Sequence, residues 1–146
     1  MLSLRPATVD DLPLILPRTR ALNAHEAITL DPAVHAAALD HLLREAEVGG
    51  VWLIERDAIA IGYAMVTFGY DLEFDGRDAT LTELWIDPAE RGRGAGREVL
   101  QLLDPELRAR GVHALHLQVR PDNPALRLYA RSGFVASPRV VMTRRL

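Results

Sequence analysis

The sequence predicts a single α/β (α+β) domain, with one layer of sheet flanked by helices. Its 146 residues are close to the usual length of one domain, and 49% of them are hydrophobic, which is enough to bury a core. Apolar runs of strand character alternate with helical patterns along the chain. No repeat and no linker rich in Pro, Gly or Ser interrupts this order. We therefore expect one domain over residues 1–146.

The first third of the chain predicts a short strand and two helices. Residues 2–5 alternate weakly between apolar and polar and form the strand. Asp10 is expected to cap a helix that runs to about Ala24. Asp31-Pro32 opens a second helix, which ends before Gly49-Gly50. The apolar face of this second helix would hold Val34, Ala38, Leu39, Leu42 and Leu43.

The middle of the chain predicts a β-hairpin followed by a further strand. Residues 51–54 and 58–68 are apolar runs joined by a short polar turn. The acidic, Gly-containing segment 71–78 is expected to be a loop, and residues 79–86 the next strand.

The last third begins with the most regular helical pattern of the chain. This helix spans about residues 94–110, and Pro105 should kink it or end it early. It is followed by a strand, a short helix and two closing strands, expected at residues 114–119, 124–131, 134–135 and 140–143.

Composition limits the classes of function. The absence of Cys excludes disulfides, thiolate catalysis and Cys-based zinc sites. The five His are scattered along the chain, so we expect no metal site. The longest apolar-leaning run, residues 58–70, is too short to cross a bilayer, and the first residues lack the apolar core of a signal peptide. These features favour a cytoplasmic protein without a membrane partner.

Charge is divided unevenly along the chain. All 17 basic residues are Arg. Residues 1–90 carry 6 Arg and 16 acidic residues, a balance of −10, whereas residues 91–146 carry 11 Arg and 4 acidic residues, a balance of +7. Such a division predicts one surface for a polyanion and another for a cation. We expect no nucleic-acid partner, because aromatic residues total only 5% and the Arg are interrupted by an amphipathic helix.

The strongest local motif is the Arg- and Gly-rich segment between the strand at 79–86 and the long helix. Three glycines at alternate positions let the backbone approach a ligand closely, and the helix N-terminus and three Arg add positive charge. This chemistry suits a pyrophosphate group, although a flexible turn with solvated charges remains the alternative. The motif is neither a Walker A loop nor the dinucleotide-binding fingerprint. Its residues are Arg91, Gly92, Arg93, Gly94, Ala95, Gly96 and Arg97.

A second motif follows one helix and one strand later, where Leu128-Tyr129 precedes Gly133-Phe134. The two motifs, in this order, resemble the GNAT superfamily of N-acetyltransferases. The first matches that family's Arg/Gln-x-x-Gly-x-Gly/Ala loop, and the second its Leu-Tyr-x-x-x-Gly-Phe ending. The resemblance covers nearly the whole chain. It implies a central mixed, strongly twisted sheet with helices on both faces, splayed open between the strands at 79–86 and 114–119.

The resemblance implies acetyl-CoA as co-substrate, with no metal. Backbone N–H groups over residues 91–97 would bind its pyrophosphate, and the pantetheine arm would pair with the strand end formed by Leu84, Trp85 and Ile86. Family members carry an Asn seven residues before the motif Tyr, where this chain has Asp122, with Asn123 one position later. Asn123 is our expected pantetheine contact, although loss of that contact remains open.

The resemblance also implies the catalytic residues. Tyr129 matches the Tyr that protonates the leaving thiolate. Glu83 lies where many family members carry an acid, and it is our expected base because amines near pH 7 are mostly protonated. A solvent-facing Glu83 on an alternating strand is the alternative. We interpret the histidines as surface or structural residues, located at His25, His35, His41, His113 and His116. A contribution of one of His25, His35 and His41 to substrate binding is the alternative, because the resemblance places the first two helices beside the acceptor site.

The expected function is transfer of an acetyl group from acetyl-CoA to a primary amine by direct attack in a ternary complex. Six acids between Asp71 and Asp87 resemble the acidic acceptor side of polyamine-type family members, so we expect a cationic small-molecule acceptor of polyamine, diamine or aminoglycoside type. Protein N-termini or amino acids as acceptors, and a catalytically idle acyl-CoA-binding module, are the alternatives. The resemblance is also compatible with a homodimer.

Overall fold

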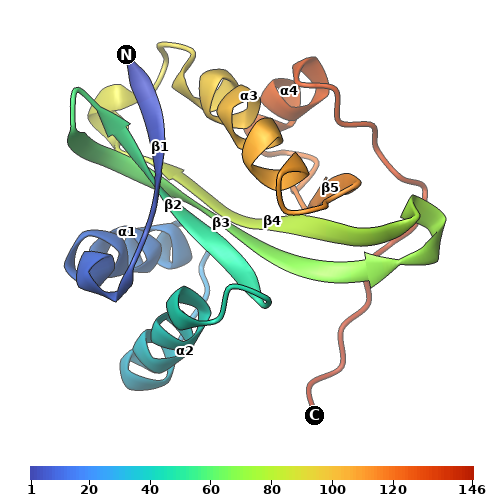
Figure 1. Ribbon diagram of the computed structural model, residues 1–146, viewed down its shortest axis with the longest axis horizontal. Helices are drawn as coiled ribbons and strands as arrows, with labels where there is room; N and C mark the ends of the chain where they lie inside the picture. The colour runs from blue at the N-terminus through green and yellow to red at the C-terminus, as the bar shows by residue number, and fades with distance from the viewer.

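A five-stranded sheet with the order β1-β2-β3-β4-β5 forms the centre of the molecule (Figure 1). The computed structural model describes residues 1–146. Neighbouring strands pair antiparallel up to β4, and β5 joins β4 in parallel after a helical crossover, so the sheet is mixed as expected. The strands are β1 (Leu2–Pro6), β2 (Gly49–Arg56), β3 (Ile59–Asp71), β4 (Gly76–Ile86) and β5 (Ala114–Leu117).

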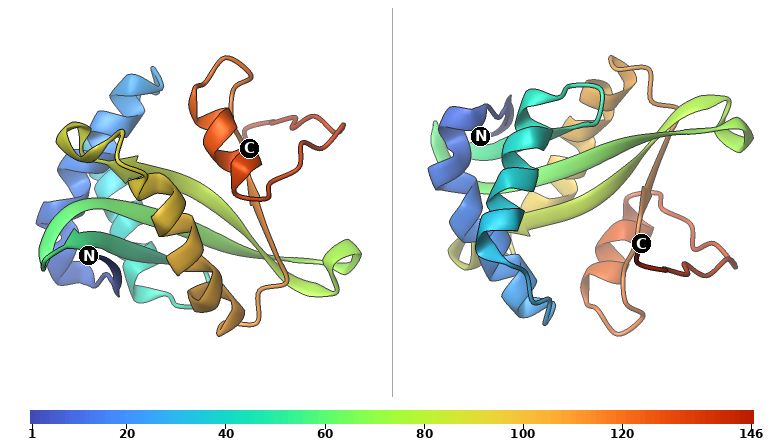
Figure 2. Two further views of the ribbon diagram at one scale, coloured as in Figure 1. Left: turned by 90° about the horizontal axis from the view of Figure 1, so that it is seen from above. Right: turned by 90° about the horizontal axis from the view of Figure 1, so that it is seen from below.

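Helices cover both faces of this sheet (Figures 1 and 2). One face carries the first two helices, and the opposite face carries the last two. The helices are α1 (Leu12–His25), α2 (Pro32–Arg44), α3 (Ala95–Arg108) and α4 (Ala125–Arg131). None of them has the length and apolar character needed to cross a membrane.

The two cores meet in β2, which is buried on both faces. Because side chains alternate across a strand, Trp52 and Ile54 pack into the core beneath α3, whereas Val51 and Leu53 pack into the core beneath α1 and α2. This two-sided burial explains why residues 51–54 form an unbroken apolar run rather than an alternating one.

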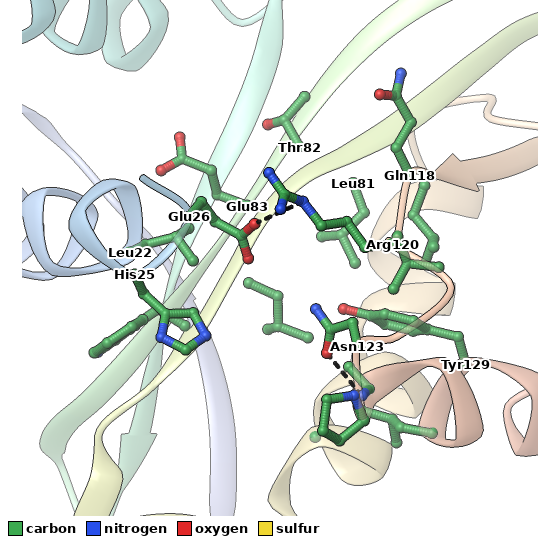
Figure 3. A pocket seen from close by; sticks show the side chains of 18 of the residues that line it. Leu22, His25, Glu26, Leu81, Thr82, Glu83, Gln118, Arg120, Asn123 and Tyr129 are labelled. Carbon is green, nitrogen blue, oxygen red and sulfur yellow. Dashed lines mark hydrogen bonds and ion pairs between the residues drawn. The ribbon is translucent and has the colours of Figure 1, made fainter. Parts of the chain in front are cut away.

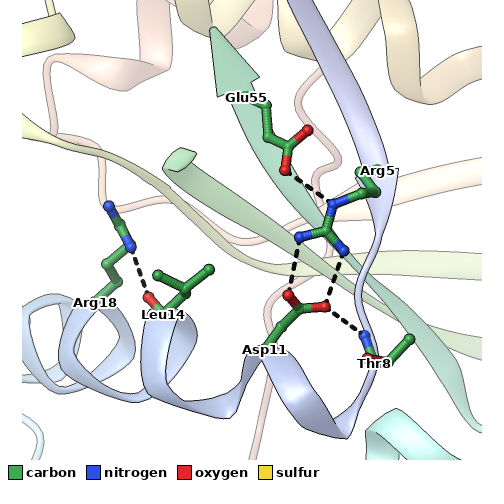
Figure 4. Close-up of polar contacts among 6 residues, drawn as sticks. All are labelled: Arg5, Thr8, Asp11, Leu14, Arg18 and Glu55. Atoms are coloured by element: carbon green, nitrogen blue, oxygen red, sulfur yellow. Dashed lines mark hydrogen bonds and ion pairs between the residues drawn. The ribbon is translucent and has the colours of Figure 1, made fainter. Parts of the chain in front are cut away.

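The start of α1 differs from the sequence prediction. A single 3₁₀ turn (Val9–Asp11) precedes the helix, and Asp11 rather than Asp10 makes the terminal contacts (Figure 4). The Asp11 carboxylate accepts the Thr8 backbone N–H at 2.8 Å and pairs with both terminal nitrogens of Arg5 at 2.9 and 3.1 Å. Asp11 is preferred because it reaches Arg5 on β1, whereas Asp10 points to solvent.

The second helix begins as predicted, because the Asp31 side chain accepts the backbone N–H groups of Ala33 and Val34. Its predicted apolar face is only partly correct. Leu39 is buried, but Val34 is 68% exposed because it lies in the first turn, beyond the edge of the sheet's core.

Half of the predicted loop at residues 71–78 is strand, and only residues 72–75 form the connection. A 3₁₀ turn (Leu72–Phe74) and the left-handed Asp75, with φ 64°, complete the connection, and β4 begins at Gly76. Asp78 is paired with Gly69, so the antiparallel ladder of β3 and β4 continues almost to the turn. The acidic residues were a poor guide here because exposed strand ends tolerate charge.

Helix α3 continues three residues beyond Pro105, to Arg108, so the proline does not end it early. A proline close to a helix C-terminus removes a single backbone donor, and the buried stripe that includes Val99, Leu103 and Leu107 holds the last turn against the sheet.

The two predicted closing strands, at residues 134–135 and 140–143, are absent, since no strand follows α4. Val135, Val140 and Met142 are each more than 80% exposed. Strand propensity alone does not form a strand without a pairing partner. Instead, Arg139 donates to Glu73 at 2.7 Å, which holds this segment against the β3–β4 hairpin.

Candidate active site

Strands β4 and β5 separate to open the principal cavity. They pair only between Asp78–Leu81 and Ala114–Leu117, while β4 continues for five more residues to Ile86. The expected splay is therefore confirmed. A bulge at Thr82 marks its beginning, because Met65 pairs with Glu83 and the next pair joins Val66 to Leu81. The opening is a cavity of about 1030 Å³ between the end of β4, residues 117–121, the end of α1 and α4.

The Arg/Gly loop lies at the β4 end of this cavity, which Arg91 and Gly96 line. Gly92 and Gly94 have φ of 77° and 79°, in the left-handed region that favours glycine. The six backbone N–H groups of residues 92–97 donate no hydrogen bond within the protein. A run of free donors that ends at a helix N-terminus fits a phosphate group.

The three arginines of this loop have different surroundings. The Arg91 guanidinium folds back onto β4, where it donates to the Ile86 carbonyl at 2.7 Å and stacks over Trp85 at 4.5 Å from the ring centroid. Arg93 and Arg97 are exposed and form no ion pair. Arg91 therefore anchors the loop to the strand, and the other two remain free to meet an anion.

The structure divides the predicted cofactor-binding residues into two groups. Those that line the cavity are Leu84, Trp85, Ile86, Arg91, Gly96 and Asn123. Those that lie on the adjoining loop without lining it are Gly92, Arg93, Gly94, Ala95 and Arg97.

At the start of α4, Asn123 lines the cavity whereas Asp122 does not. The Asn123 Oδ1 atom accepts the backbone N–H of Ala125 at 2.9 Å, which orders the first turn of α4. The side-chain NH₂ group of Asn123 has no partner in the protein.

Tyr129 lies on α4 at the opposite side of the cavity from Glu83 (Figure 3). Its ring packs edge-to-face against Phe134, with centroids 5.8 Å apart. Its hydroxyl makes no hydrogen bond within the protein. Burial, together with the nearby negative charge of Glu26, raises the pKa of Tyr129, so the hydroxyl stays protonated.

Glu83 is half-buried and hydrogen-bonded rather than solvent-facing. Its Oε1 atom accepts the Thr19 hydroxyl at 2.5 Å and the Tyr63 hydroxyl at 2.7 Å. Thr19 and Tyr63 are both fully buried, on α1 and β3. Burial and the charge of Glu83 raise the pKa of Tyr63, which keeps this donor protonated.

Among the further residues that line the cavity, three can carry charge and were not predicted as site residues: His25, Glu26 and Arg120. His25 was expected on the surface, and it is exposed but faces the cavity. Glu26 and Arg120 approach to 3.9 Å across the opening (Figure 3). No local pattern marks them, because they come from the end of α1 and from the segment after β5.

The acidic stretch from Asp71 to Asp87 does not form one face beside the cavity, contrary to expectation. Of its six acids only Glu83 lines the cavity. Asp87 pairs with Arg18 at 2.7 Å, and Asp78 with His116 at 3.1 Å. The others lie at the tip of the β3–β4 hairpin, because that strand pair extends away from the helices (Figure 1).

The fold is a mixed five-stranded sheet covered by helices on both faces, with an open cleft between β4 and β5. A sequence model of the acetyltransferase (GNAT) family matches residues 18–134, and the chain belongs to this family.

Similar sequences are found among curated proteins. An uncharacterized protein of Mycobacterium leprae is 31% identical over 140 residues, which cover 89% of this chain and 37% of that protein. A [ribosomal protein bS18]-alanine N-acetyltransferase of Salmonella typhimurium is 45% identical over 58 residues, which cover 39% of each chain. The matched regions thus span less than two thirds of these relatives' own lengths.

Solved structures share the fold. A possible acetyltransferase from Clostridium difficile 630 superposes with a TM-score of 0.87 at 16% identity, covering 100% of this chain and 98% of that one. A predicted acetyltransferase from Clostridium acetobutylicum, solved with acetyl-CoA, gives a TM-score of 0.80 at 19% identity, covering 99% and 96%.

Proposed function

We propose that this chain transfers an acetyl group from acetyl-CoA to a primary amine by direct attack. The observation that supports this most strongly is the cleft between β4 and β5. It adjoins a run of free backbone donors at one end, and has Glu83 and Tyr129 on opposite sides.

The cleft suits acetyl-CoA in both charge and shape. The free N–H groups of residues 92–97 would hold the pyrophosphate, with Arg93 and Arg97 adding charge. Beyond Leu81, the edge of β4 that faces β5 has no strand partner. This edge would receive the amide groups of the pantetheine arm. Asn123 would contact that arm through its free NH₂ group.

The chemistry requires two protons to leave the nitrogen and one proton to reach the sulfur. Glu83 accepts the first proton from the incoming ammonium, which frees the nitrogen lone pair, and later returns it to solvent. The nitrogen attacks the thioester carbonyl, the new C–N bond forms and the C–S bond breaks. The leaving thiolate takes the proton of the Tyr129 hydroxyl, and the Tyr129 oxygen regains a proton from the acylated nitrogen, which becomes the neutral amide.

The acceptor that we propose is a small cationic amine. Support comes from Glu26 and Glu83, the two carboxylates that line the cavity, rather than from the acids of the hairpin. Arg91 and Arg120 line the same cavity, and Arg120 lies 3.9 Å from Glu26, so these carboxylates attract a cation locally rather than through the net charge of the cavity. The relative from Salmonella typhimurium is named for an alanine of a ribosomal protein, so a protein N-terminus is the competing acceptor.

Steady-state acetyl transfer across a panel of amines tests this proposal. Polyamines, diamines and aminoglycosides should show higher kcat/KM than neutral amino acids and Ala-terminated peptides. Their kcat/KM should fall as ionic strength rises. Higher kcat/KM for the Ala-terminated peptides would assign the site to protein N-termini instead.

A further inference from the structure

Glu83 belongs to a hydrogen-bonded chain that extends to α2. The Thr19 hydroxyl donates to Glu83 Oε1 at 2.5 Å and also lies 3.3 Å from Nε2 of His35. The Tyr63 hydroxyl donates to the same Oε1 atom. Two elements, α1 and β3, thus donate to one oxygen of one carboxylate, and α2 reaches that oxygen only through Thr19.

The proton arrangement of this chain follows from counting donors. A hydroxyl has a single proton, and an ionised carboxylate can only accept. When Thr19 donates to ionised Glu83, its contact with His35 is a hydrogen bond only if Nε2 carries a proton and donates. The donor sequence is then His35 to Thr19 to Glu83.

From this arrangement we infer that His35 is a positioning residue for acetyl transfer, and that it acts through Thr19. Its N–H fixes the Thr19 oxygen as an acceptor, so the Thr19 proton must point at Glu83. The inference rests on the proposed function, in which Glu83 is the base.

The two oxygens of Glu83 therefore have different surroundings. Both hydroxyl donors engage Oε1, and Oε2 has no partner within the protein. Two hydroxyl donors on the same oxygen restrict the rotation of the carboxylate group. The chain therefore holds the base in one rotamer, with one oxygen left to take the proton of the acceptor.

Two matched pairs of variants test this inference. His35→Gln keeps an N–H donor on the side chain, whereas His35→Leu removes it. Thr19→Ser keeps the hydroxyl, whereas Thr19→Val replaces it with a methyl group of similar volume. His41→Leu, at an exposed position on the same helix, is the control.

With a strongly basic amine, kcat of His35→Leu and Thr19→Val should fall by about tenfold, the effect expected when a hydrogen bond to a charged group is lost. His35→Gln and Thr19→Ser should stay within about threefold of wild type. The KM for acetyl-CoA should be unchanged in all five variants. A purely structural role of His35 would lower the melting temperature without separating Gln from Leu.

A second acceptor sharpens the test. A weakly basic amine is already neutral at the assay pH and needs no base to free its lone pair, so the defect of His35→Leu should shrink with it. Wild-type kcat in His35→Leu, or an equal loss in His35→Gln, would overturn the role of His35. Failure of the wild-type protein on every amine would instead reject the proposed function.

Discussion

Tyr129 combines a packed ring with a hydroxyl that has no partner in the protein. Removal of that hydroxyl in Tyr129→Phe should therefore leave the melting temperature nearly unchanged. We expect kcat to fall by about 10–10³-fold while the Kd of acetyl-CoA holds, because a transition-state interaction is lost. Steady-state kinetics and calorimetry measure the two quantities. A kcat within twofold of wild type would make Tyr129 structural and leave protonation of the thiolate to water.

Glu26 is the residue whose charge distinguishes cationic from other acceptors in our account. Glu26→Gln removes the charge at the cavity while keeping the shape of the side chain. With diamines KM should rise by about threefold to tenfold, whereas kcat should change little. Asp75→Asn, at the tip of the hairpin, is the control and should leave KM unaltered. Equal KM values for wild type and Glu26→Gln would remove the support for a cationic acceptor.

Asp11 shows how one buried carboxylate links stability to pH. Its bonds to Arg5, and the backbone N–H of Thr8, hold the pKa of Asp11 below its ordinary value. A depressed folded pKa gives stability that is present above the unfolded value of about 3.9 and is lost as pH falls through the folded value.

At pH 7 the Asp11→Asn variant should lose about 1–3 kcal/mol of unfolding free energy. The difference from wild type should shrink below about pH 4, because Asp11 of the unfolded chain is then protonated, and folding must remove that proton until the pH falls through the lower folded pKa. Urea denaturation at several pH values measures this difference. A gap that stays constant down to pH 2 would mean that the ion pair contributes nothing.

Among the structural elements, the Arg/Gly loop carries the clearest anion-binding geometry. Gly94 has φ of 79°, and a Cβ added there would meet nothing within 4 Å. Asn and Asp tolerate this conformation better than other residues do. Gly94→Asn and Gly94→Asp therefore share the backbone cost and differ in charge.

We expect Gly94→Asp to bind CoA at least tenfold more weakly than Gly94→Asn, because its carboxylate repels the phosphates. Circular dichroism should show that both variants remain folded. Equal affinities of the two for CoA, measured by calorimetry, would show that the pyrophosphate lies elsewhere.

The elements that could be predicted from the sequence are those determined by local signals. Helix α2 begins at the predicted Asp31 cap, and the hairpin of β2 and β3 follows its apolar runs. The prediction of two closing strands was wrong because a strand needs a partner to pair with. The local pattern around Val140 and Met142 does not reveal whether such a partner exists. The predicted loop at 71–78 was too long, because the ladder of β3 and β4 extends to Asp71 and Gly76 and leaves only residues 72–75 as the connection.

The candidate site could also be predicted only in part from the sequence. Glu83, Asn123 and Tyr129 could be placed at the cavity by motif, since each belongs to a pattern along the chain. Glu26 and Arg120 could not, because only the packing of α1 beside the segment after β5 brings them together. The contact of His35 with Thr19 likewise depends on tertiary structure alone.

For the whole molecule, ion pairs between distant elements use part of the charge, and several of them lie within the acidic residues 1–90. Arg18 joins α1 to Asp87 after β4, and Arg56 joins β2 to Glu90. The loop arginines Arg93 and Arg97 remain unpaired. The basic half therefore keeps free charge where we place the anionic co-substrate.

Binding of CoA should consequently stabilise the whole domain. At a concentration of about 100 times Kd, a ligand specific for the folded state adds about 2.7 kcal/mol, which corresponds to several degrees in Tm. The shift should decrease as NaCl is added, because screening weakens the phosphate contacts. Thermal melts with and without CoA measure it. A Tm that does not respond to CoA would argue against the cleft as its site.

Amine-dependent release of the CoA thiol by the wild-type protein tests the central claim most directly. The account predicts that thiol is released from acetyl-CoA only when an amine is present, with one acetylated amine formed for each thiol, as verified by mass spectrometry. Binding of acetyl-CoA without amine-dependent thiol release from any member of the panel would contradict it, and would define the chain as a CoA-binding module instead.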